Sequence, residues 1–161
     1  MATVQRRPLM RRFDSPEQEA FLSLWRTYDR LRALEDELFA KFDLTAQQYN
    51  VLRLLRAADP ASVPTQAVGQ RLVSRAPDVT RMLDKLAERG LIARERTDRD
   101  RRTVLVRLTA EGRILLVEIA APLRICHARQ LGHLSPADLQ HLTALLQAAR
   151  APHEPTDSPW Q

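Results

Sequence analysis

The sequence is poor in several residues and motifs, and each absence limits what the protein can be. Its one cysteine, Cys126, excludes an internal disulfide framework or a cysteine-rich zinc site. No apolar run approaches the roughly 20 residues of a membrane-spanning helix, and the N-terminus lacks an apolar stretch of signal-peptide length. We therefore expect a cytoplasmic protein without membrane contact. Gly-rich phosphate loops and the G-x-S-x-G and H-E-x-x-H motifs are also missing, so we expect no enzyme.

Lysine is nearly absent, because all but two of the 25 basic residues are arginine. The formal net charge is +5, and the positive charge is concentrated in two segments. Residues 1–12 carry four arginines and no acid, and residues 62–113 carry 12 basic and 7 acidic residues. The second segment is either an ordinary solvated surface or a face that binds the phosphates of a nucleic acid.

Helix-start signals divide the 161 residues into a series of helices. Side chains suited to N-caps precede apolar residues at helical spacing at six positions, which are Ser15, Thr45, Thr65, Ser74, Thr109 and Ser135. The first helix is predicted to run to about Phe42. The helix after Thr109 is predicted to bend or break at Pro122.

The helix predicted over residues 75–89 has the pattern of a DNA recognition helix. Its apolar residues Val79, Met82, Leu83 and Leu86 follow helical spacing and would face the core, and Gly90 suits the left-handed residue that ends a helix. Asp84 is predicted on the outward face. The residues predicted to contact DNA from this segment are Ser74, Arg75, Thr80, Arg81 and Lys85. The alternative is an ordinary surface helix with arginine–aspartate pairs.

A wing is predicted over residues 91–108, with Leu91–Ile92 and Val104–Val106 as paired strands. Its tip carries several arginines, whose positive charges repel one another unless acidic groups neutralise them. We expect Asp98 and Asp100 to brace the tip internally. Arg99 and Arg101 would reach phosphates or the narrow minor groove, and Arg102 suits either role.

The predicted fold is mainly α with a small β-hairpin wing, a winged helix-turn-helix flanked by dimerisation helices. The long first helix carries an apolar stripe that one subunit covers only in part, so we infer a two-fold dimer. The expected segments are a basic disordered tail (1–14), an N-terminal dimerisation helix (15–44), the DNA-binding domain (45–109), C-terminal dimerisation helices (110–150) and a flexible tail (151–161).

Three stretches resemble the MarR family of multiple-antibiotic-resistance-type regulators. They are V-T-R-M-L-D-K-L-A-E-R-G-L-I from Val79, D-R-R from Asp100 and L-T-A-E-G from Leu108. The resemblance implies a homodimeric repressor that binds a palindromic operator in double-stranded DNA. It also implies release from DNA by a small phenolic or anionic effector, bound between the dimerisation helices and the winged domain. Asp78 and Ala87 depart from the family pattern.

The effector pocket is predicted from Trp25, Tyr28, Tyr49 and Arg53, although an aromatic stripe on a helix is also typical of a core. Asp78 has two accounts. It is either an acid placed in the first helical turn, where the helix dipole favours it, or the partner of a wing arginine in a ligand-operated switch. The second arrangement is similar to the urate-responsive branch of the family, which uses a helix-1 tryptophan and an acid near the recognition helix. Trp25 and Asp78 would match these two residues.

Cys126 is interpreted as a packed, inert thiol, with a redox sensor as the alternative. Cys126, His127, His133 and His141 lack the spacing of a metal site, so we expect no metal and no cofactor.

The leading functional hypothesis is a dimeric, sequence-specific transcriptional repressor. The alternative is a winged-helix module that binds proteins, against which the arginines of the wing argue.

Overall fold

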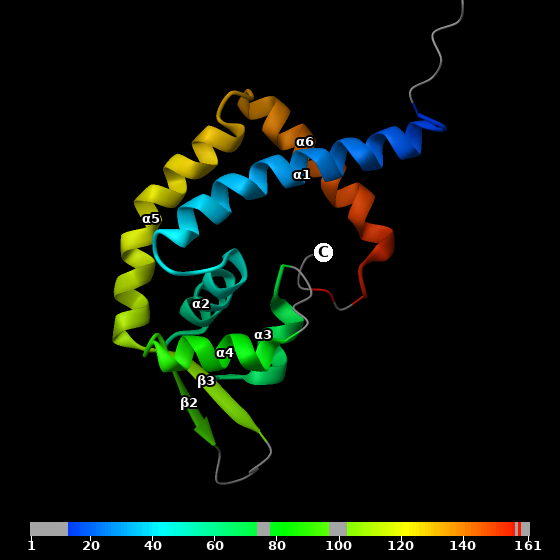
Figure 1. Cartoon of the computed structure of the whole chain (residues 1–161). Coiled ribbons are helices and arrows are strands. Elements are labelled where there is room, and N and C mark those ends of the chain that lie inside the picture. The colour runs from blue at the N-terminus through cyan, green and yellow to red at the C-terminus, as the bar shows by residue number, and fades with distance from the viewer. Residues whose placement is uncertain (1–12, 74–77, 97–102, 157, 159–161) are drawn as a thin grey trace, which may run out of the picture. The chain divides into compact units, whose positions relative to one another are not determined.

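A computed structural model describes residues 13–73, 78–96, 103–156 and 158 (Figure 1). The chain divides into two compact units, residues 1–33 and 34–161. The elements follow in the order α1 (Pro16–Ala40), α2 (Ala46–Ala58), β1 (Val63–Pro64), α3 (Thr65–Arg71), α4 (Val79–Glu88), β2 (Ile92–Arg96), β3 (Val104–Leu108), α5 (Ala110–Leu131), α6 (Pro136–Arg150) and a 3-10 turn (Ala151–His153). The prediction of a mainly α fold with a small β wing is confirmed.

The first unit contains the start of α1, capped as its sequence predicts. The backbone N–H of Gln18 donates to Ser15 Oγ at 3.2 Å. The helix then carries large apolar side chains that remain exposed, among them Phe21 at 61% and Trp25 at 62%. Their ring centroids lie 6.1 Å apart. This segment therefore presents an aromatic surface that its own unit does not bury.

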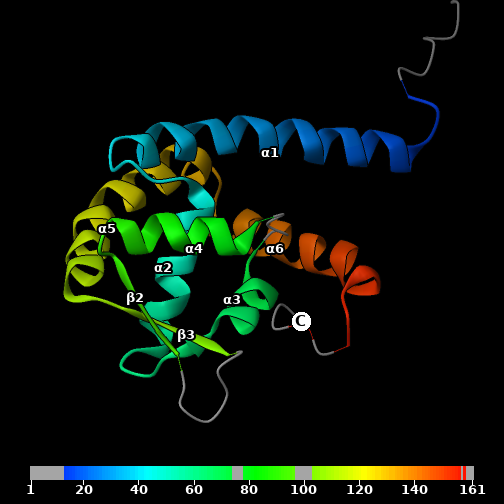
Figure 2. The same cartoon turned by 60° about the horizontal axis from the view of Figure 1, so that its bottom comes forward.

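The core of the second unit lies where α2, α3 and α4 pack with the sheet (Figure 2). Leu52 and Leu55 of α2, and Leu83 and Leu86 of α4, are almost wholly buried. Thr45 begins α2 with the predicted reciprocal capping box, in which its hydroxyl and the Gln48 side chain each accept a backbone N–H. Local capping signals and apolar spacing thus agree in placing α2 and α4.

The sheet has three antiparallel strands in the order β1-β3-β2. Ile92 pairs with Leu108 and Arg96 with Val104, which confirms the predicted hairpin, whose strands run further than the apolar residues alone indicated. Strand β1 was not expected, because its two residues lie in a proline-rich segment. A proline is tolerated there because β1 is an edge strand.

The prediction that Thr65 caps α3 is wrong. The N-cap position is Pro64, which has no side-chain capping bond. The Thr65 hydroxyl instead donates to the backbone oxygen of Val104 at 3.0 Å. The residue therefore ties the start of α3 to β3, a contact across 39 positions that local sequence does not reveal.

The helix after Thr109 was predicted to bend or break at Pro122. It does not break, because α5 is one helix from Ala110 to Leu131. A proline within a helix costs about 3 kcal/mol. Burial of Ile119 before it and Cys126 after it holds both segments of the helix in place. The predicted caps are confirmed, since Thr109 Oγ1 accepts from Gly112 N–H and Ser135 Oγ accepts from Asp138 N–H.

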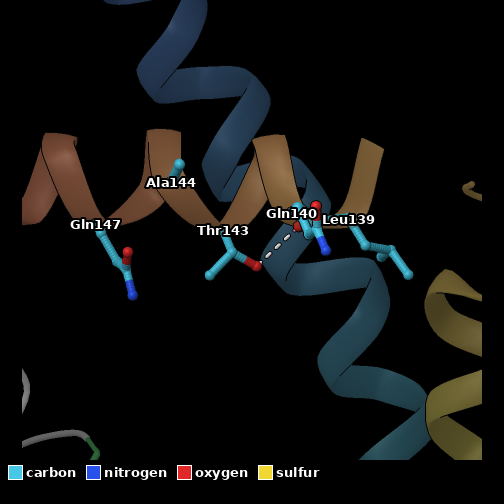
Figure 3. Close-up of a pocket in the computed structure, with 5 residues that line it drawn as sticks. All are labelled: Leu139, Gln140, Thr143, Ala144 and Gln147. Atoms are coloured by element: carbon cyan, nitrogen blue, oxygen red, sulfur yellow. Dashed lines mark hydrogen bonds between the residues drawn. The ribbon is translucent and has the colours of Figure 1, made fainter. Parts of the chain in front are cut away.

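Helix α6 has no buried residue along its length. One side of it carries a hollow of about 300 Å³ (Figure 3), whose lining residues are Leu139, Gln140, Thr143, Ala144 and Gln147. The Thr143 hydroxyl donates to the Leu139 carbonyl at 2.8 Å, so this donor is already used within α6. Within the described residues, no helix is long and apolar enough to cross a membrane.

Candidate nucleic-acid interface

The recognition helix α4 begins later than the sequence indicated. Its N-cap is Asp78, whose Oδ1 accepts the backbone N–H of Arg81 at 2.9 Å. The prediction of Ser74 as the cap is therefore wrong. An aspartate carboxylate is as good a capping acceptor as a serine hydroxyl. Ser74 and Arg75, both predicted to contact DNA, lie outside the described residues.

The two faces of α4 follow the predicted pattern. Leu83 and Leu86 are fully buried, and Met82 is 8% exposed. Val79 is half-buried against the same core. Thr80, Arg81 and Lys85, predicted to contact DNA, are all exposed. The helix thus buries one face and presents two cations and a hydroxyl on the other, which is the division that major-groove recognition requires.

Asp84, which was predicted on the outward face, has a cationic partner. Its carboxylate forms an ion pair with the Arg94 guanidinium of β2. The two side chains are 47% and 26% exposed, so the pair is partly shielded from water. It connects the middle of the recognition helix to the wing. Sequence reasoning missed this pair because the facing of Arg94 depends on the strand register, which no local pattern determines.

The strands of the wing are held together by a second ion pair. Arg107 on β3 donates from Nε to Glu95 Oε1 on β2 at 2.7 Å. Arg107 lies opposite Ala93, so Glu95 is its diagonal neighbour, a distance that a long side chain can span. The predicted DNA contacts Arg99, Arg101 and Arg102 and the predicted braces Asp98 and Asp100 lie outside the described residues.

A hollow of about 330 Å³ lies between the start of α2 and the start of α4. Its lining residues are Thr45, Gln47, Gln48, Asp78, Arg81, Met82 and Lys85. Arg81 and Lys85 therefore border a concave polar surface, and Asp78 is the one acid among its described lining residues.

Asp78 is the N-cap of α4 and does not lie in the first turn, as the first account predicted, but its capping bond supports the reason given there, a favourable interaction with the helix start. Two arginines of the wing strands have other acidic partners, because Arg94 pairs with Asp84 and Arg107 with Glu95. An aspartate at this position both accepts an N–H bond and interacts favourably with the helix dipole. A pair between Asp78 and an arginine of the wing tip falls outside the described residues, and the switch hypothesis stays a prediction.

The two properties of Asp78 can be separated by substitution. Asp78→Ala removes the cap and is expected to lower the free energy of unfolding by about 1 kcal/mol. Asp78→Ser keeps a capping oxygen but removes a negative charge from a surface bordered by Arg81 and Lys85. It should keep wild-type stability and bind DNA roughly two- to fivefold more tightly at low salt. Urea denaturation and fluorescence anisotropy measure these effects. An alanine variant as stable as the wild type would refute the capping role.

The predicted effector residues are distributed over both units. Trp25 and Tyr28 belong to the first, where they are 62% and 56% exposed. In the second, Tyr49 is half-buried and stacks on Phe39 with centroids 4.8 Å apart, and burial raises the pKa of its phenol. Arg53 is exposed and donates to Asn50 Oδ1. Neither of the two hollows described above is lined by these residues. Their joint role stays a prediction.

Cys126 is 5% exposed within α5. Burial, followed by the negative charge of Glu35, raises the pKa of its thiol. The thiolate is the reactive form, so a raised pKa and burial both disfavour oxidation. These observations favour the packed thiol over the redox sensor. The side chain of the neighbouring His127 also lies near Glu35, with Nε2 and Oε1 3.5 Å apart.

Helices α2, α3 and α4 followed by the β2–β3 hairpin define a winged helix-turn-helix protein (Figure 1). The MarR family model matches residues 44–104, from the segment before α2 to the first residue of β3. The helix-turn-helix transcriptional regulator YkoM of Bacillus subtilis is 30% identical over 143 residues, which are 85% of this chain and 90% of that protein. The chain therefore belongs to the MarR family of transcriptional regulators. It is a DNA-binding regulator and not an enzyme.

Solved structures agree with this assignment. A MarR transcription factor from Planctomyces limnophilus is 50% identical with a TM-score of 0.69, over 85% of this chain and 99% of that one. A point mutant of Escherichia coli MarR in complex with operator DNA is 25% identical with a TM-score of 0.73, over 81% of this chain and 93% of that one.

Proposed function

We propose that this protein is a homodimeric, ligand-responsive repressor that binds a palindromic operator in the cytoplasm. The observation that carries the proposal is the two-sided recognition helix. Leu83 and Leu86 anchor α4 in the core, and Arg81 and Lys85 face outward beside a wing. Arginine and lysine at such positions neutralise phosphates or read guanine in the major groove.

Dimerisation is supported by apolar side chains exposed outside the DNA-binding region. In the second unit they lie on α5 and α6 and include Ile114, Val117, Ile125 and Leu145, each at least 57% exposed. In the first unit α1 adds Phe21 and Trp25. Large apolar patches on a water-soluble protein mark interaction surfaces, and a second copy of the chain fits a palindrome because both have two-fold symmetry.

The repressor role and the effector are supported by named relatives. The Bacillus subtilis protein MdtR, 29% identical over 143 residues, is called a transcriptional repressor. A structure of Bordetella bronchiseptica BpsR, 29% identical, concerns regulation of its DNA binding by 6-hydroxynicotinic acid. That molecule is an aromatic acid, which matches the phenolic or anionic class expected here. Trp25, Tyr28, Tyr49, Arg53 and Asp78 remain our candidates for contacting such an effector.

The test uses the purified full chain. The DNA that it prefers is selected from a random duplex library, and the mass of the protein is determined by light scattering. We expect a particle of twice the 18.4 kDa chain mass and a palindrome with half-sites about one helical turn apart. Affinity should fall steeply with salt. Phenols and aromatic acids that raise the melting temperature should release the DNA. Equal affinity for the selected and random duplexes would refute specific regulation and favour the protein-interaction alternative.

A further inference from the structure

Helix α1 is followed by a hydrogen-bonded turn that lies in the second unit. Asp43 has a left-handed backbone, with φ of 54°. The N–H of Leu44 donates to the Phe39 carbonyl at 3.0 Å, and the N–H of Asp43 to the Ala40 carbonyl at 3.1 Å. This pair of bonds is the Schellman motif, and the buried side chains of Phe39 and Leu44 complete it from within the core.

The recognition helix ends in the same motif. Gly90 is its left-handed residue, with φ of 69°. The N–H of Leu91 donates to the Leu86 carbonyl at 3.0 Å, and the N–H of Gly90 to the Ala87 carbonyl at 2.9 Å. Leu86 and Leu91 are buried in the same core as Phe39 and Leu44. The ends of α1 and α4 are therefore both anchored, and little local rearrangement is open to either.

Arg89 joins these two helix ends. It is the C-cap residue of α4, and its guanidinium donates from Nη1 to the Asp43 carbonyl and from Nη2 to the Phe42 carbonyl, the latter at 3.1 Å. The last carbonyls of a helix lack partners within the helix and carry its negative dipole end. A planar cation with two parallel donors suits both needs at once.

The carbonyls matter more than the nearby carboxylate. Asp43 Oδ2 lies 3.9 Å from Arg89 Nη1, and its side chain is 95% exposed, whereas that of Arg89 is 31% exposed. A pair with one fully solvated member is weak. The direction of the guanidinium is therefore determined by two backbone oxygens, whose positions follow from the turn after α1.

We infer that Arg89 is a positioning residue that sets the orientation of the recognition helix relative to the end of α1, and so determines which half-site spacing the dimer accepts. The inference rests on the proposed function, in which α1 belongs to the dimer interface. In such a dimer each α4 is located through its own α1, so the two joints determine the distance and twist between the recognition helices. One added base pair moves a half-site by about 3.4 Å and rotates it by about 35°.

Arg89 is suited to this role because α4 also has apolar contacts with the core that do not involve its guanidinium. Helix α4 also packs against α2, α3 and β2 through Met82, Leu83 and Leu86. These apolar contacts should keep α4 folded and attached when the side chain is shortened. What is lost is the directional link to the end of α1, which apolar packing does not replace because it is not directional.

The test measures how the full-length dimer discriminates between its selected palindrome and palindromes with one base pair inserted or removed at the centre. For the wild type we expect a loss of on the order of tenfold or more for either change. Arg89→Ala should reduce that ratio to about threefold or less while keeping the dimer, with binding to the optimal site also weakened. Arg89→Lys, a cation without the planar fork, should give an intermediate ratio.

Two controls separate positioning from general damage. Arg113→Ala removes an arginine whose Nη1 lies 2.9 Å from both carboxylate oxygens of Asp59, away from the α1 end. It should lower stability without changing the spacing ratio. Asp43→Asn keeps a residue that tolerates the left-handed backbone and keeps its carbonyl, so the ratio should also stay at the wild-type value.

The outcomes separate failure of the proposed function from failure of the role of Arg89. A wild-type protein that shows no preferred palindrome would refute the proposed function itself. A wild-type protein with a clear spacing preference that Arg89→Ala retains in full would refute the role of Arg89 alone. An equal change in the ratio for Arg89→Ala and Arg113→Ala would also refute it, because the effect would then reflect lost stability.

Discussion

Replacing Gly112 with alanine is expected to lower the free energy of unfolding by about 3 kcal/mol, the upper end of the usual cost of overpacking. A Cβ at this position would lie 2.3 Å from the backbone oxygen of Leu91 and 2.7 Å from Leu108 Cδ1. The first of these neighbours is backbone at the base of the wing and has little room to move. For a protein of this size the melting temperature should fall by roughly 6–12 °C, measured by calorimetry.

The reason for this close approach is the joint between the wing and α5. Thr109 donates from its backbone N–H to the Leu91 carbonyl at 3.2 Å and from its hydroxyl to the Gly90 carbonyl at 2.7 Å. The first turn of α5 is thereby held against the corner between α4 and β2. Only a residue without a side chain fits at position 112, which gives a physical reason for the glycine in the L-T-A-E-G stretch.

Gly69 provides a matched control within the same unit. It also lies in a helix, α3, but among the described residues an added Cβ would meet only Val79 Cγ2, at 3.4 Å. Gly69→Ala should therefore stabilise the protein by about 0.5–1 kcal/mol, because alanine loses less conformational entropy in a helix. If Gly112→Ala instead melted at or above the wild-type temperature, the close packing of α5 on the wing base would be refuted.

Removing both described cations of the recognition helix, by Arg81→Ala with Lys85→Ala, is expected to weaken operator binding by about 2–4 kcal/mol, or roughly 30- to 1000-fold. Both side chains are exposed on the face opposite Leu83 and Leu86. If both contact phosphates, the slope of log K against log salt should become shallower by about 2. If Arg81 instead reads a guanine, discrimination at one base pair should be lost.

The matched control removes the same charge from α5, by Arg124→Ala with Arg129→Ala. Both arginines are exposed and lie outside the helix-turn-helix. As long as light scattering shows that this variant is still a dimer, its binding should stay within about threefold of the wild type, since distant exposed charges are screened at physiological salt. Equal losses in the two double variants would mean that total charge, and not the face of α4, governs binding.

Most of the helical structure could be predicted because its signals are local. The spacing of Met82, Leu83 and Leu86 defines one face of α4 over two turns, and Thr45, Thr109 and Ser135 act as caps through bonds to residues three positions away. One failure arises where two local signals compete. Ser74 and Asp78 both suit an N-cap, and only the observed start of α4 at Val79 distinguishes them.

By itself, the sequence determined the winged helix-turn-helix, the buried and exposed faces of its recognition helix and, through its relatives, the family. These depend on helical periodicity, capping and turn chemistry, which act between residues close in the chain. Only the tertiary structure decided the links of α4 to its surroundings: Arg94 with Asp84, and Arg89 with the carbonyls after α1. These contacts span 10 and 47 positions and require strand register and helix-end geometry, which arise only when the whole core packs.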